Sequence, residues 1–190
     1  MKVSQQIVGV NQRLGNTAVP NMQGTTRMIF DSQAMVAATN QTLTFFNGVS
    51  SRLYPNANIN SNKFEVGESL AIQTISFGFV TADPTTLAVN IDPNASAGAT
   101  STSSLIFNFY IGNQRVIKDL DLNYSRFGIG EAYSSASVKN VLHLETPIII
   151  PPQIEFYATV RVAASAATTT NRFYLFIGGT GTLLNTKSNF

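Results

Sequence analysis

The sequence contains no cysteine. This absence excludes disulfide bonds, a thiol nucleophile and a metal site built on thiolates. Histidine occurs once, as His143 within VLHLE. Its alternation with Leu142 and Leu144 is typical of a structural or surface position on a strand, and no nucleophile motif accompanies it. A catalytic triad is recognised by geometry and stays open as a minor alternative, but we predict that the protein is not an enzyme.

Charged residues are also scarce, at 12% of the chain, which is about half of the usual share. Small neutral residues such as Ser, Thr, Asn, Gln, Ala and Gly take their place. A soluble enzyme usually keeps more surface charge, whereas small neutral side chains lose their hydration at low cost. The composition therefore favours a surface that becomes buried against neighbouring molecules.

Long apolar runs are absent too. No window approaches the roughly 18 apolar residues of a membrane-spanning helix, and the N-terminus lacks the apolar core of a signal peptide. The glycines of GGTGT at 178–182 lack the lysine of a phosphate-binding loop. We expect no transmembrane segment, no secretion signal, no cofactor and no small-molecule substrate.

What the sequence does show is alternation with period two, and no helical period is sustained over three turns. Leu105, Phe107, Phe109 and Ile111 share one face of SLIFNFYI, and Gly112-Asn113 follows before QRVIKDLDL. Two strands separated by Gly-Asn predict a tight hairpin, because both residues tolerate positive φ. About eight or nine such runs predict an all-β antiparallel sandwich.

Two stretches depart from simple alternation. In ESLAIQTISFGFVT, Leu70 and Ile72 have one parity and Ile75 and Phe77 have the other, which predicts a β-bulge near Gln73-Thr74. In HLETPIIIPPQIEFYATV, three prolines argue against central pairing. We interpret TPIIIPP as a stiff corner between the strands VKNVLHLE and QIEFYATVRVA, with the isoleucines at 148–150 extended and at least partly buried.

The first 24 residues lack convincing periodicity and suggest an N-terminal arm, followed by a β-sandwich domain over residues 25–190. Lys2, Arg13 and Arg27 are the only charged residues among the first 30, whereas the remainder holds nine basic and ten acidic residues. We expect the arm to grip a neighbouring subunit or, alternatively, to lie along its own domain. Weak contact with nucleic acid is a further option, because three charges release few counterions.

Asp119 and Asp121 are the only weak candidates for metal binding. Period two places both carboxylates of D-L-D on one strand face, where they could join backbone carbonyls around Ca²⁺. The favoured alternative is a solvated strand end facing Arg115 or Lys118. Glu65 and Glu68 are likewise interpreted as part of a turn that enters a strand.

Aromatic residues within expected strands are assigned to the core. Those in expected loops can be anchors between subunits or platforms for stacking a sugar, and the sequence does not separate the two uses. The candidate interface residues are the three basic residues Lys2, Arg13 and Arg27 together with Tyr54, Tyr124, Phe127, Tyr133 and Phe190.

The stretches KFEVGESLAIQTISFGFV, FNFYIGNQRVIKDLDL and TPIIIPPQIEFYATVRV, behind an irregular arm, resemble the style of viral jelly-roll capsid proteins, in particular those of bacteriophage virions. The resemblance covers roughly residues 25–185. It implies a single jelly roll of two four-stranded sheets, with many copies packed together and bound to other virion proteins in a particle assembled in the host cytoplasm. A shell, vertex or cement subunit fits this pattern. The alternative is a carbohydrate-binding β-sandwich from a receptor-binding or fibre module.

Overall fold

The structure is a computed structural model that describes residues 22–36, 38–47, 54–59, 61–80, 103–121, 141–165 and 172–184. Within these residues the chain forms eight strands and no helix, as predicted. The strands are β1 (Met22–Ala34), β2 (Ala38–Phe45), β3 (Ser69–Val80), β4 (Ser103–Ile111), β5 (Gln114–Asp121), β6 (Val141–Ile150), β7 (Phe156–Ser165) and β8 (Arg172–Leu184).

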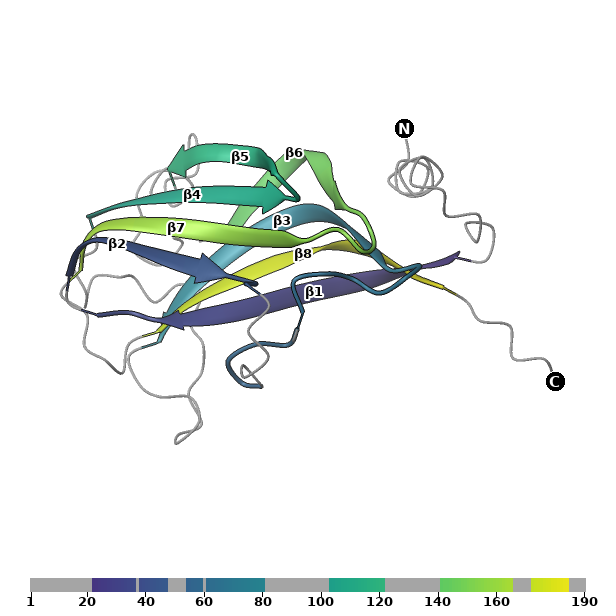
Figure 1. The fold of residues 1–190 in the computed structure, drawn as a ribbon, viewed down its shortest axis with the longest axis horizontal. Coiled ribbons are helices and arrows are strands. Elements are labelled where there is room, and N and C mark those ends of the chain that lie inside the picture. The colour runs from purple at the N-terminus through teal and green to yellow at the C-terminus, as the bar shows by residue number, and fades with distance from the viewer. Residues whose placement is uncertain are drawn as a thin grey trace, which may run out of the picture.

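The strands build two four-stranded antiparallel sheets that pack against each other (Figure 1). Sheet A has the order β1-β8-β3-β6, and sheet B has the order β2-β7-β4-β5. The pairing is nested, since β1 pairs with β8, β2 with β7, β3 with β6, and β4 with β5. Apart from β4 and β5, consecutive strands belong to different sheets, so the chain repeatedly crosses between the layers. The predicted antiparallel sandwich is confirmed.

The core between the sheets follows the predicted alternation. On β4, Leu105, Phe107 and Phe109 are fully buried, and on β7 the same holds for Phe156, Ala158, Val160 and Val162. Rings from the two sheets meet directly, because Phe45 of β2 lies 5.6 Å from Phe173 of β8 between centroids. Burying each large apolar side chain contributes about 1.5–3 kcal/mol, so this cluster is the main source of stability.

The predicted hairpin and bulge are both present. Gly112 adopts a φ of 55° in the turn between β4 and β5, a conformation that glycine accepts without strain. In β3 the ladder shifts register between Ile72 and Thr74 against both neighbouring strands. The shift lets Leu70 and Ile72 on one side of the bulge, and Ile75 and Phe77 on the other, all reach the core.

The interpretation of TPIIIPP as a connection outside the sheet is wrong in one respect. β6 continues through Pro147 to Ile150, and Ile148, Ile149 and Ile150 pair with β3. Proline is tolerated because β6 is an edge strand and its register against β3 breaks between residues 143 and 148, where Pro147 lies. The isoleucines are extended and at least partly buried, as predicted, and the chain turns only after Ile150.

Strand β1 covers TRMIFDSQA, the stretch with mixed periodicity, but it begins earlier than expected. Its first pair joins Met22 to Leu184, so the last residues assigned to the arm belong to sheet A. Residues 1–21 lie outside the described part of the chain.

Candidate interaction surfaces

The structure describes two of the eight candidate interface residues, Arg27 and Tyr54. The other six lie outside the described residues: Lys2, Arg13, Tyr124, Phe127, Tyr133 and Phe190. Arg27 and Tyr54 occupy very different environments, and only one of them is presented to solvent.

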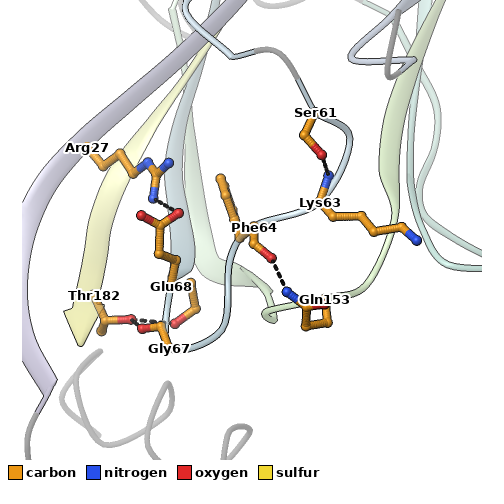
Figure 2. Close-up of polar contacts among 9 residues, drawn as sticks. Arg27, Ser61, Lys63, Phe64, Gly67, Glu68, Gln153 and Thr182 are labelled. Atoms are coloured by element: carbon orange, nitrogen blue, oxygen red, sulfur yellow. Dashed lines mark hydrogen bonds and ion pairs between the residues drawn. The ribbon is translucent and has the colours of Figure 1, made fainter. Parts of the chain in front are cut away.

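Arg27 lies at one end of the sandwich and is engaged within its own chain (Figure 2). Its guanidinium donates to the carboxylate of Glu68 over 3.0 Å, and its Cζ lies 4.4 Å from the ring centroid of Phe64. Both charged side chains are about one quarter exposed. Ion pairing and the cation–π contact satisfy the charge locally, so Arg27 has little left to offer a partner.

The loop that carries Phe64 closes this end of the core. The carbonyl oxygen of Phe64 accepts hydrogen bonds from the backbone N–H and the side-chain amide of Gln153, at 3.0 and 3.1 Å. The hydroxyls of Ser69 and Thr182 share a buried 2.6 Å hydrogen bond, and Thr182 also donates to the carbonyl of Gly67. The network in Figure 2 joins β1, β3, β8 and the turn after β6, which makes it a structural closure.

Tyr54 is 82% exposed at the start of a short segment, residues 54–59, that runs along β1. Asn58 anchors this segment: its side-chain oxygen accepts from the N–H of Phe30, and its side-chain nitrogen donates to the carbonyl of Met28. Tyr174 donates from its hydroxyl to the carbonyl of Pro55. Tyr54 therefore remains available as a contact residue on an anchored segment.

Asp119 and Asp121, the weak candidates for metal binding, are both exposed at the end of β5. β5 has a register shift between Ile117 and Leu120, the residues that face Phe109 and Phe107, and Asp119 there has a φ of 48°. Asp119 forms an ion pair with Arg115 at 3.3 Å, the partner expected in the favoured alternative. Within the described residues, no three acidic or histidine side chains gather as metal ligands would.

The remaining predicted polar residues have structural surroundings. His143 is exposed on the edge strand β6, opposite Thr74. Glu68 donates its N–H to the carbonyl of Glu65, and the intervening Gly67 has a φ of 84°, so this is the turn that the sequence predicts. None of the described segments forms a helix of the length and hydropathy that a membrane span requires.

The outer face of sheet A carries almost no charge. We call it the neutral face and define it by the paired, outward-facing residues of the four strands. Its charged side chains lie at the margins: Glu145 is exposed on the edge strand β6, and Arg172 lies at one end. The Arg172 guanidinium donates to the hydroxyl and carbonyl oxygens of Ser32. The other members are Gly24, Thr26, Met28, Phe30, Ser32, Ala34, Ser69, Ala71, Thr74, Ser76, Gly78, Val141, His143, Ile149, Tyr174, Phe176, Gly178, Thr180 and Thr182.

Three large side chains of the neutral face form what we call the apolar trio: Met28, Phe30 and Phe176. The rings of Phe30 and Phe176 lie 5.7 Å apart between centroids, and both are half-buried. Met28 is 55% exposed, and a Cβ on Gly178 would lie 3.6 Å from the Met28 methyl carbon. The absence of a side chain at Gly178 therefore leaves room for Met28 to lie across β8.

The outer face of sheet B, which we call the charged face, has a different chemistry. Tyr110 and Tyr157 stack there with centroids 4.4 Å apart and planes within 6°. Arg115, Lys118, Asp119, Asp121 and Arg161 are exposed on β5 and β7. A small hollow of about 80 Å³ lies among Asn40, Ile106, Arg161, Val162 and Ala163.

Sequence reasoning missed the neutral face, although a signal for it was present. In TRMIF and in RFYLFIGG, apolar residues occupy both parities, which a half-solvated strand does not show. In the sequence of β1, apolar residues at both parities look like weak periodicity. It reflects a strand with an apolar inner face and a partly apolar outer face.

No family model matches the chain, and no curated protein and no solved structure matches it either. The surfaces and their chemistry are therefore the basis for a functional proposal.

Proposed function

We propose that the protein is a structural virion subunit, of the shell, vertex or cement kind, that works by packing against copies of itself and other virion proteins. The neutral face carries this proposal. A free antiparallel sandwich usually turns polar and charged side chains toward water. Here the four strands carry charge only at the margins of the face, as Arg172 at one end and Glu145 on the edge strand β6.

The energetics of burial favour this use of the neutral face. Desolvating a charge costs several kcal/mol unless a partner compensates it, whereas apolar surface gains about 25 cal/mol for each Å² removed from water. Thr and Ser hydroxyls lie between these extremes, and they can bond to a partner or to bridging water. A face of this composition is inexpensive to bury, and its centre has no charge to direct it toward a charged ligand.

The nested strand pairing supports a single jelly roll, the fold that the resemblance to bacteriophage virion proteins implies. Pairing of β1 with β8, β2 with β7, β3 with β6 and β4 with β5 corresponds to one long antiparallel ribbon wound into a sandwich. The fold serves many functions, so the proposal depends on the neutral face, and a location in the virion follows from the proposed role.

Measuring the oligomeric state of the full chain by light scattering and sedimentation velocity tests the proposal. We expect concentration-dependent assembly that weakens when residues 1–21 are deleted, if these residues grip a neighbour. The deletion should stop before Met22, because that residue already pairs with Leu184. A chain that stays monomeric at every concentration would contradict a role in assembly.

A carbohydrate-binding module is the second candidate, and the aromatic pair of the charged face favours it. Tyr110 and Tyr157 lie partly exposed on the same sheet as the hollow beside Asn40 and Arg161. However, each ring already covers one face of the other, which leaves only the two outer ring faces for a sugar. A glycan array with the full chain and with Tyr157→Ala tests this candidate, and saturable binding that the substitution removes would support it.

A further inference from the structure

The apolar trio gives the neutral face a centre of the kind that dominates stable protein contacts. Aromatic and methionine side chains are enriched in buried interface cores. Phe30 and Phe176 lie opposite each other on neighbouring strands, and their rings pack in a tilted arrangement. Met28 keeps more than half of its surface exposed, although its methyl group lies near Gly178. Contacts within the chain therefore position the apolar trio, while part of its surface remains exposed to solvent.

The lack of charge at the centre of the neutral face limits which partners it can bind. In a two-fold contact the same patch meets itself, so every charged residue near the axis is placed close to its own copy. Such a contact would bring Arg115, Lys118 and Arg161 of the charged face into mutual repulsion. The centre of the neutral face meets no such penalty, because Arg172 lies at one end, hydrogen-bonded to Ser32, and Glu145 lies on the edge strand β6, on the opposite side of the sheet from β1. An acidic or basic partner would find almost nothing to pair with.

Part of the neutral face is already covered within the chain, because Ser32, Ser69, Ala71 and Tyr174 are fully buried. Its exposed part includes Thr26, Met28, Phe30 and Phe176, so a contact with a second copy would be centred on these residues. Two sheets can pack in this way at about 10 Å separation.

We propose that the neutral face binds the neutral face of a second copy of this chain, in a two-fold contact centred on Met28, Phe30 and Phe176. The inference rests on the proposed assembly function and names the partner of its principal surface. Tyr54, on the segment anchored to β1, then lies near the rim of the contact.

Opposite charges at position 28 provide a direct test. Met28→Lys and Met28→Glu each place a charge near its own copy, and we expect each variant alone to self-associate about a hundredfold more weakly than the natural chain. Mixing the two variants in equal amounts should restore association, because lysine then faces glutamate. Val116→Lys is the matched control, since Val116 is 41% exposed on β5 of the other sheet. Sedimentation velocity gives the association constants, and circular dichroism checks that each variant is folded.

The possible outcomes separate this inference from the proposed function. If the natural chain does not self-associate, both are overturned. If it assembles and the variants at position 28 assemble equally well, the inference is wrong and the assembly function stands. If both variants are weakened but the mixture does not recover, the face contacts a different surface of the second copy, and the inference of a two-fold contact is again overturned. Recovery in the mixture, with Val116→Lys unchanged, supports it.

Discussion

Sheets A and B have equivalent inner faces and contrasting outer faces. Inside, each contributes alternating aliphatic and phenylalanine side chains to one shared core. Outside, sheet A presents Met28, Phe30 and Phe176 among small neutral residues, whereas sheet B presents Arg115, Lys118 and Arg161. The inner faces must match because the sandwich has a single core. The outer faces have no such constraint, so the difference in their chemistry indicates whether each one contacts water or another molecule.

The largest expected loss of stability comes from a substitution in the centre of sheet A, where β8 packs against β3. In β8, a Cβ on Gly179 would collide with the carbonyl oxygen of Ala71 beside the β3 bulge, so Gly179→Ala must displace backbone. We expect a loss of about 3 kcal/mol in the free energy of unfolding, or failure to fold. Gly24→Ala is the control, because nothing lies within 4 Å of its added Cβ. Equal stability of the two variants in urea unfolding would contradict the tight packing of β8 against β3.

A matched pair of threonines sharpens the comparison of the two outer faces. Thr26 is exposed on the neutral face, and Thr42 is exposed on β2 in sheet B. We expect Thr26→Lys to weaken self-association about tenfold, because it introduces a charge into the contact. Thr42→Lys should change self-association by about twofold or less. Thr26→Lys should change monomer stability by about 0.5 kcal/mol or less. Thr42→Lys should cost up to about 1 kcal/mol, because Thr42 faces Arg161 on β7. Equal effects on assembly would remove the distinction between the faces.

The stacked tyrosines of the charged face should stabilise sheet B in the monomer. A double-mutant cycle with Tyr110→Ala and Tyr157→Ala should give a coupling energy of about 0.5–1 kcal/mol in urea unfolding. The coupling should not depend on protein concentration, because the contact lies within one chain. A coupling that appears only in the assembled form would mean that the charged face also takes part in assembly.

The smallest effect is expected for the surface ion pair of β5. Arg115 and Asp119 are joined at 3.3 Å, but their side chains are 38% and 57% exposed. Water and salt screen such a pair, so Asp119→Asn should cost about 0.5 kcal/mol or less in unfolding. Repeating the measurement at high salt should reduce the difference further. The hydrogen bond from the backbone N–H of Asp119 to the side chain of Asn108 remains in both variants, so a loss that persists unchanged in salt would contradict the ion pair as its cause.

Local patterns in the sequence predicted several features correctly. The Gly112-Asn113 turn depends on adjacent residues, and the β3 bulge depends on a parity change within one strand. The course of β6 was harder to predict, because Pro147 excludes central pairing but not a place in an edge strand with broken register. The candidate site was predicted least well: Arg27 is paired with Glu68, a residue far along the chain, and the neutral face was not recognised.

The sequence by itself determined the alternation of each strand, the Gly112-Asn113 hairpin, and a composition with no cysteine and little charge, because these are properties of neighbouring residues or of the whole count. Only the tertiary structure decided which strands became edges and which side chains share a surface. Phe30 and Phe176 meet because β1 pairs with β8, from opposite ends of the described chain. A face built by such long-range pairing becomes visible only when the strands are placed side by side.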